Sequence, residues 1–241
     1  IAGACVSDII KAGVLPVAIE YMDRKVIEVV ESYAKAGYPD CEALLIVEVE
    51  GSEQEIDEQL GLIKQIAAKH DPVELREAQD AEEAGRIWLG RKSAFGAMGQ
   101  INDYMCLDGT IPVSSLPFVL RRIGELSEEF GLEVGNVFHA GDGNMHPLIL
   151  FDANKPGDLE TCEEMGAEIL KLCVEVGGCL TGEHGVGIEK RDLMNVQFAP
   201  GDLEIQMRVK DVFDPAWLLN PAKVFPLANS AGRRAPADAA A

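Results

Sequence analysis

The chain alternates between segments rich in β-forming residues and segments with the apolar spacing of an amphipathic helix. The links between them are too short to carry the crossovers of a large parallel sheet. The alternation therefore predicts the α+β class: a mostly antiparallel sheet with helices packed on one face, plus a helical segment at the C-terminus. Strands are predicted at 14–23, 42–51, 73–79 and 103–112, a hairpin at 136–152, and helices at 24–36, 53–70, 80–97, 114–131, 157–176, 189–195 and 201–213.

Charge and hydrophobicity exclude several classes of function. The 241 residues carry 41 acidic and 21 Lys or Arg side chains, a net charge of −20, which argues against nucleic acid or an anionic membrane as a partner. The longest apolar runs, 43–47 and 148–151, are far too short to span a bilayer. The start at Ile1 has no Met and no basic region, so it reads as a cut inside a longer polypeptide. Residues 228–241 contain few large apolar side chains and are expected to be disordered.

Two of the four histidines flank a tight turn in the stretch HAGDGNMH, residues 139–146. Asp142-Gly143 is a favoured pair for a two-residue type I′ turn, since both turn positions need positive φ. A turn centred there makes His139 and His146 a directly opposed cross-strand pair. Their Cβ atoms would lie about 4.5–5.5 Å apart, close enough for both rings to bind one metal ion.

A divalent ion needs a third ligand, and Glu183 in the stretch TGEHGVG is the best candidate. Two histidines and one carboxylate, with open positions left on the metal, form a common catalytic arrangement. The plainer alternative is that both histidines only satisfy hydrogen bonds at a sheet edge, with the glycines serving the turn. Spacing alone leaves both readings open.

Other polar residues have equally plain readings. Arg91, on a predicted helix, would ordinarily be solvated or ion-paired. Asn220 could simply end a helix before Pro221, and Lys223 could be a surface charge. His70 lies at a helix end, where a cation suits the helix dipole, and it receives no functional role.

Three motifs in this order carry a family resemblance: HAGDGNMHP, GGCLTGEHGVGIEK and NPAKVFP. Together they resemble the C-terminal half of FAD-linked 2-hydroxy acid dehydrogenases in the vanillyl-alcohol oxidase-like superfamily. Within that superfamily the likeness is to the flavin subunits of glycolate oxidases and to D-lactate dehydrogenases. It implies that residues 1–227 form a substrate or cap domain with a ferredoxin-like core. In the family an FAD-binding domain precedes this part, and the resemblance implies that residues 1–227 do not include it.

The resemblance assigns roles to individual residues. It implies that His139, His146 and Glu183 ligate a divalent metal, zinc or a similar ion. His184 would be the catalytic base, and Arg91 would grip the substrate carboxylate. The resemblance places three further residues near the FAD cofactor: Asn144, Asn220 and Lys223.

One departure from the family pattern bears on the substrate. In the hydroxyglutarate dehydrogenases a lysine stands two residues before the position of Asp108, where this chain has Cys106. The lack of that second cation favours a small monocarboxylate such as glycolate or D-lactate. The expected reaction removes the hydroxyl proton through His184, with hydride transfer to FAD and the metal lowering the hydroxyl pKa.

The resemblance also implies partners and a location. The partners would be a small 2-hydroxy acid and an FAD-binding domain in the same full-length polypeptide; electron-transfer subunits and a homodimer stay open. The expected location is the cytoplasm, with peripheral attachment to the inner membrane through partner subunits as an alternative. Two other functions remain: a stand-alone metal- or ligand-binding module without redox activity, and a metal-dependent hydrolase that activates water.

Overall fold

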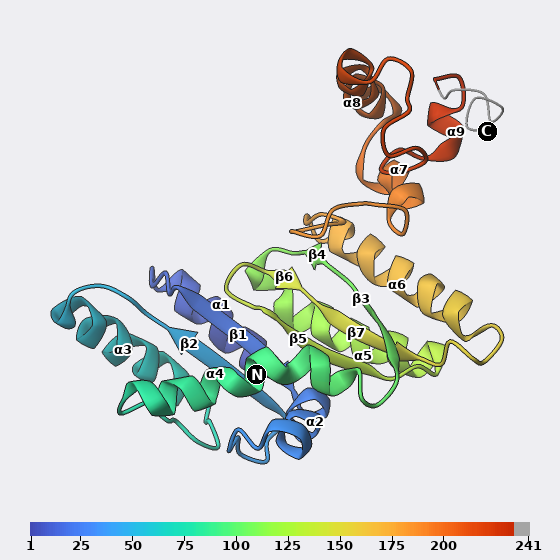
Figure 1. The fold of residues 1–241 in the computed structure, drawn as a ribbon. Coiled ribbons are helices and arrows are strands. Elements are labelled where there is room, and N and C mark those ends of the chain that lie inside the picture. The colour runs from blue at the N-terminus through green and yellow to red at the C-terminus, as the bar shows by residue number, and fades with distance from the viewer. Residues whose placement is uncertain (234–241) are drawn as a thin grey trace.

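The computed structural model describes residues 1–233 (Figure 1). Its strands are β1 (Ala18–Asp23), β2 (Ala43–Glu48), β3 (Asp103–Cys106), β4 (Gly109–Thr110), β5 (Val134–His139), β6 (Asn144–Met145) and β7 (Pro147–Phe151). Its α-helices are α1 (Ala2–Lys11), α2 (Arg24–Ala34), α3 (Glu53–Ala68), α4 (Ala81–Met98), α5 (Leu116–Phe130), α6 (Asp158–Glu175), α7 (Met194–Gln197), α8 (Pro200–Phe213) and α9 (Leu227–Ser230). Short 3₁₀ turns, η1 (Val113–Ser115) and η2 (Arg191–Leu193), precede α5 and α7.

The strands form one sheet around the central strand β5. β1 pairs with β2 and with β5, β5 continues to β6 and β7, and these pair with β4 and β3. Every one of these pairings between described strands is antiparallel, including β3 with β7 and β4 with β6. The predicted α+β class with an antiparallel sheet is therefore confirmed.

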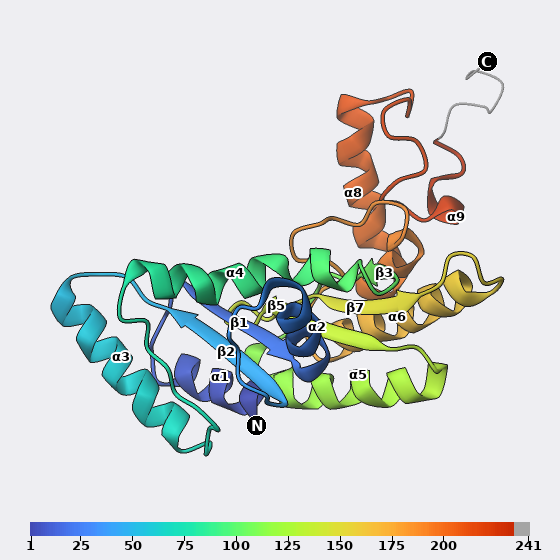
Figure 2. The same ribbon diagram turned by 60° about the horizontal axis from the view of Figure 1, so that its bottom comes forward.

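Helices cover both faces of the sheet, so the prediction of helices on one face is wrong. Tyr21 and Phe138 pack into one core with α1, α5 and α6, whereas their neighbours Met22 and Val137 pack into a second core with α2 and α4. Figure 2 shows α4 on one side of the sheet and α1 and α5 on the other. The reason lies in the strands: β7 reads PLILF, without the polar alternation of a sheet that has one face in water.

Local signals placed most helix ends correctly. Ser52 and Glu55 form the expected capping box at the start of α3. Gly131 ends α5 in the left-handed conformation. The strand predicted at 73–79 is wrong, because this stretch pairs with no described strand and leaves Val73 and Leu75 exposed. It is a loop that joins α3 to α4.

The C-terminal helical segment, α7 to α9, is confirmed and stands beyond the end of α6 (Figure 1). Trp217 packs there against Phe225 with 5.8 Å between ring centroids. The disorder expected from 228 onward is wrong for 228–233, because α9 runs to Ser230 and Arg233 pairs with Glu204. The remainder of that prediction, 234–241, lies outside the described residues. No helix in the described part of the chain has the length and apolar content to cross a bilayer.

Candidate metal and substrate site

The site lies on the sheet face that α4 covers, near the ends of the central strands. The register aligns Glu20 of β1 with His139 of β5, and His139 with Asn144 of β6. Aligned residues point to the same face of a sheet, and His146 follows Asn144 by two positions along the chain. Glu20, His139, Asn144 and His146 therefore share one face, with Arg91 on the helix above it.

The hairpin brings the two histidines together, but not through the predicted turn. His139 lies opposite Asn144, so the connection has four residues, 140–143, and among these only Gly143 has positive φ, at 69°. The expected direct opposition of His139 and His146 is wrong. The two rings are diagonal neighbours, with 5.4 Å between centroids and planes at 82°. The turn packs closely against residue 111: a Cβ at Gly143 would lie 2.1 Å from the Ile111 carbonyl oxygen, so only glycine fits there.

Hydrogen bonds fix which nitrogen each ring presents. His146 Nδ1 lies 2.9 Å from the Leu107 carbonyl oxygen, and His139 Nδ1 lies 2.8 Å from Glu20 Oε1. These oxygens only accept, so each Nδ1–H donates to them, and in the neutral form of each ring Nε2 carries the lone pair. Nε2 lies 3.0 Å from Glu183 Oε1 in His146 and 3.7 Å from the same oxygen in His139. Both Nε2 atoms thus lie close to one oxygen of the Glu183 carboxylate.

The surroundings shift the pKa values of these groups in opposite directions. Burial lowers the pKa of His146, which keeps its imidazole neutral and ready to bind a metal. The hydrogen bond to Glu20 raises the pKa of His139. Burial alone would raise the pKa of Glu20, but the hydrogen bond to His139 and the charge of Arg91 outweigh it and lower that pKa. Glu20 is therefore a carboxylate, and it orients His139 as carboxylates orient metal-binding histidines.

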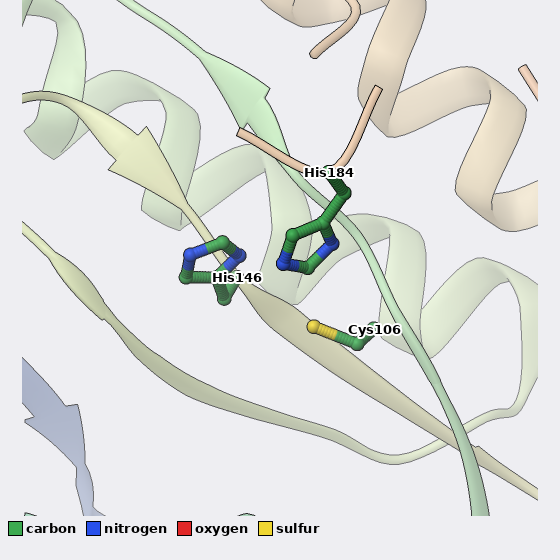
Figure 3. A group of neighbouring side chains, drawn as sticks. All are labelled: Cys106, His146 and His184. Carbon is green, nitrogen blue, oxygen red and sulfur yellow. The ribbon is translucent and has the colours of Figure 1, made fainter. Parts of the chain in front are cut away.

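His184 approaches the same place from the loop after α6. Its ring stacks on that of His146, with 5.0 Å between centroids and 14° between planes. Figure 3 shows the two rings beside each other, with the Cys106 sulfur directed toward them. The side chain of His184 is 46% exposed, and its Nε2 lies 3.9 Å from Glu183 Oε1. His184 is thus next to the convergence point and open to solvent on one side.

Several donor sets in the described residues could hold a metal. Potential ligand atoms lie within 4.8 Å of one another in two of them: Asp108, His146, Glu183 and His184, and Cys106, His146 and His184. Ligand lone pairs lie in the ring plane, and the planes of two stacked rings do not meet at one ion. His139 belongs to neither set, but its ring is perpendicular to that of His146 and its Nε2 lies 3.7 Å from Glu183 Oε1.

Asp108 and Cys106 are poorly suited as ligands. Both Asp108 oxygens already accept hydrogen bonds, from the 181–184 loop and from Lys190. Burial and the charge of Asp108 raise the pKa of Cys106 to about 12, and its thiol lies 3.4 Å from the Leu107 carbonyl oxygen. The His146 imidazole and the Glu183 carboxylate are donor types that suit a borderline divalent ion, and the His139 imidazole lies beside them.

Arg91 lies at the site, where it is buried and ion-paired rather than solvated. It is 7% exposed, its Nε donates to Glu20 Oε2 at 2.9 Å, and its guanidinium lies 5.8 Å from the Phe95 ring. Within the described residues its terminal nitrogens donate no hydrogen bond to a side chain or carbonyl. Those nitrogens remain able to bind a carboxylate in bidentate fashion.

Asn144 also belongs to the site. Its Nδ2 lies 3.5 Å from His146 Nε2, and its buried Oδ1 has no hydrogen-bond partner in residues 1–233. Gly182 packs directly on this amide, and a Cβ there would lie 2.4 Å from Asn144 Oδ1. The glycine therefore lets the Glu183 loop approach the strand.

Asn220 and Lys223 are not brought to the histidines by any contact among the described residues. Their segment does join the Glu183 loop, because the Val224 N–H donates to the Gly187 carbonyl at 2.8 Å. Asn220, Ala222 and Val224 all have positive φ, an unusual backbone for residues other than glycine. Their predicted contact with FAD stays a prediction.

Three residues at the site were missed by reasoning from sequence: Glu20, Asp108 and Lys190. The first two are acidic residues inside strand-like segments, VLPVAIEYMD and DYMCLDGTIP. An acidic side chain in an apolar strand is costly to bury unless it is paired. That signal could have identified Glu20 and Asp108 as paired, functional residues. No feature of the nearby sequence distinguishes Lys190 in this way.

Comparisons with known proteins identify the family of the chain. The family described as FAD linked oxidases, C-terminal domain, matches residues 1–224. The chain is 50% identical over 227 residues to the glycolate oxidase subunit GlcD of Escherichia coli (strain K12), covering 93% of this chain and 46% of that protein. It is 33% identical to GlcD of Bacillus subtilis (strain 168), covering 93% of this chain and 48% of that protein.

The chain also matches more distant relatives. The D-lactate dehydrogenase of Archaeoglobus fulgidus is 31% identical, over 91% of this chain and 48% of that protein. The solved structure of 4-ethylphenol oxidase from Gulosibacter chungangensis, in complex with isoeugenol, matches with a TM-score of 0.57 at 14% identity. That match covers 86% of this chain and 47% of the oxidase, and it shows a shared fold. The chain spans about half the length of the relatives it matches. By the match over residues 1–224, the chain belongs to the family of FAD linked oxidases, C-terminal domain.

Proposed function

We propose that this chain is the substrate domain of a flavin-dependent dehydrogenase that oxidises a small D-2-hydroxy acid, glycolate or D-lactate, to the 2-oxo acid. The observation that carries the proposal is the convergence of two imidazole Nε2 atoms on one oxygen of Glu183. The names of the relatives, glycolate oxidase subunit and D-lactate dehydrogenase, supply the substrate class.

His139, His146 and Glu183 would hold a divalent ion, zinc or a similar metal, with positions left open for substrate. When bound there, such an ion polarises the substrate oxygens and lowers the pKa of the hydroxyl group. Glu20 and the Leu107 carbonyl would keep the two rings in the tautomer that ligation requires.

The chain's own residues would bind the acid and take its proton. The terminal nitrogens of Arg91 would hold the carboxylate, since Glu20 engages only Nε in the described structure. His184 Nε2 would accept the hydroxyl proton, because its ring is stacked beside the ligand set and half exposed. Oxidation releases a proton from the hydroxyl and a hydride from the adjacent carbon, and FAD supplies the hydride acceptor.

Asn144, Asn220 and Lys223 would face the flavin, whose binding domain would occupy the remaining half of the polypeptide length seen in the relatives. Asn144 has a buried oxygen free to accept a hydrogen bond, which suits that position. Electron-transfer subunits would then reoxidise the flavin. The protein would act in the cytoplasm or bound peripherally to the inner membrane through those subunits.

The test uses the full-length enzyme, with the FAD-binding domain present. Glu183→Gln should lower metal occupancy, and excess metal should partly restore the rate of flavin reduction by glycolate or D-lactate. His184→Asn should keep the metal and lower kcat by about 10²–10⁴-fold. His70→Asn is the matched control, since His70 pairs with Asp8 away from the site. A His184→Asn enzyme that turns over at the normal rate would remove His184 from the mechanism.

A further inference from the structure

Asp108 is a fully buried carboxylate beneath the loop that carries Glu183 and His184. Its exposed fraction is 0%, and its oxygens are not among the proposed metal ligands. Oδ1 accepts from the Glu183 N–H at 3.0 Å, and Oδ2 accepts from the N–H groups of Gly182 at 3.1 Å and His184 at 3.0 Å. The Thr181 hydroxyl also donates to Oδ2, and in turn accepts from the Gly185 N–H at 2.8 Å. Three consecutive backbone amides thus close on one carboxylate.

A buried cation completes this cluster. Lys190, which is 4% exposed, places Nζ 2.9 Å from Asp108 Oδ2. Removing a carboxylate from water is costly unless charge and hydrogen bonds replace the lost hydration. Here five donors do so, and a shift of the loop would take away the four that come from residues 181–184.

Asp108 is also adjacent to the other half of the ligand set. The ladder aligns Cys106 with Leu148 and Gly109 with Met145, so Asp108 stands across from His146. The preceding residue, Leu107, accepts the His146 Nδ1–H through its carbonyl. The dipeptide 107–108 therefore fixes His146 on one side and the Glu183 loop on the other.

We propose that Asp108 is a positioning residue that holds the Glu183 carboxylate and the His184 ring against His146 by binding the amides of residues 182–184. The proposal deepens the proposed function and rests on it for the metal. The loop TGEHGVG contains three glycines, and glycine loses much conformational freedom when it is ordered. Without the internal carboxylate, the loop would be free to move both side chains away from the histidine.

The test compares Asp108→Asn with Asp23→Asn in the 241-residue chain. Asp23 is a matched control, because it too accepts backbone N–H bonds, from Val26 at 3.1 Å and Asn136 at 2.7 Å, away from the site. Two quantities are measured where circular dichroism shows each variant folded: the Zn²⁺ dissociation constant, by competition with a chromophoric chelator, and hydrogen exchange of the amides of residues 182–184. Asp108→Asn should weaken Zn²⁺ binding about 10–100-fold and accelerate that exchange, while Asp23→Asn leaves both at the wild-type values.

A milder variant keeps the test decisive if Asp108→Asn does not fold. Thr181→Val removes one donor to Asp108 and should weaken Zn²⁺ binding about 3–10-fold, with faster exchange at Gly185. Wild-type Zn²⁺ affinity and unchanged exchange in Asp108→Asn would overturn the proposal, as would equal weakening by Asp23→Asn. If the wild-type chain binds no Zn²⁺, the proposed function loses its metal. The amide exchange of Asp108→Asn then decides the positioning role, and unchanged protection overturns it.

Discussion

His139 and His146 meet at right angles, with 5.4 Å between ring centroids, although neither lies opposite the other in the sheet. His139 Nδ1 is hydrogen-bonded to the Glu20 carboxylate, and His146 Nδ1 is hydrogen-bonded to the Leu107 carbonyl oxygen. Glu183 Oε1 lies next to both rings, 3.0 Å from His146 Nε2 and 3.7 Å from His139 Nε2.

The ion pair beneath His139 should matter for stability. Glu20→Gln removes the carboxylate that faces Arg91, and both side chains are under 10% exposed, at 6% and 9%. Removing one partner of a buried pair leaves an uncompensated charge and costs about 3–5 kcal/mol. Urea unfolding of wild type and variant measures the difference. The control is Glu133→Gln, whose ion pair with Lys25 is exposed and should contribute less than about 1 kcal/mol. Equal losses in the two variants would contradict this account.

Acid should weaken the fold partly through Asp108. Burial opposes ionisation, but the hydrogen bonds from Thr181, the loop amides and Lys190 outweigh it and hold the pKa of Asp108 well below its ordinary value of 3.8. The folded state therefore binds fewer protons than the unfolded state in this range. The stabilisation is complete above about pH 5 and is lost as pH falls through the ordinary value toward the lowered pKa.

Two variants separate this effect from general acid unfolding. Asp108→Asn should flatten the rise of unfolding free energy between about pH 3 and 5. Asp23 affects the pH dependence of stability in the opposite direction. Burial raises its pKa above 3.8, so its ionisation lowers the unfolding free energy as pH rises. Asp23→Asn should therefore steepen the same rise. Urea unfolding across this pH range measures both slopes, and an unchanged slope in Asp108→Asn would refute the assignment.

The turn between β5 and β6 should tolerate no side chain at Gly143. Its φ is +69°, and a Cβ would lie 2.1 Å from the Ile111 carbonyl oxygen. Gly143→Ala should cost at least about 1–3 kcal/mol of unfolding free energy. Gly124, inside α5, has open space around its missing Cβ, so Gly124→Ala should instead stabilise by about 0.5–1 kcal/mol. Differential scanning calorimetry distinguishes the two signs, and a stable Gly143→Ala protein would show that the turn can rearrange.

Local features could be predicted from the sequence because their determinants lie close together in the chain. The Ser52 and Glu55 capping box and the end of α5 at Gly131 are examples. The hairpin register could not be predicted in this way. Asp142-Gly143 favours a two-residue turn, yet the approach of Ile111 selects a four-residue connection and pairs His139 with Asn144.

The same distinction applies to the site. The two histidine motifs pointed to His139, His146, Glu183 and His184, and the structure brings these four side chains together. Glu20 comes from 119 residues before its partner His139, and Asp108 from 75 residues before Glu183. Such pairings depend on the sheet topology, and no local pattern encodes them. Arg91 was predicted at the site, but its ion pair with Glu20 was not.

The central claim is that His139, His146 and Glu183 hold one divalent ion, and X-ray absorption at the zinc edge of the Zn²⁺-loaded chain tests it most directly. The account predicts one Zn²⁺ per chain, with nitrogen and oxygen ligands at about 2.0–2.2 Å and the multiple scattering of two imidazoles. His139→Ala should remove one imidazole from that signal. A sulfur ligand at about 2.3 Å would instead place Cys106 on the ion, and that result, or an unchanged two-imidazole signal in His139→Ala, would contradict the account.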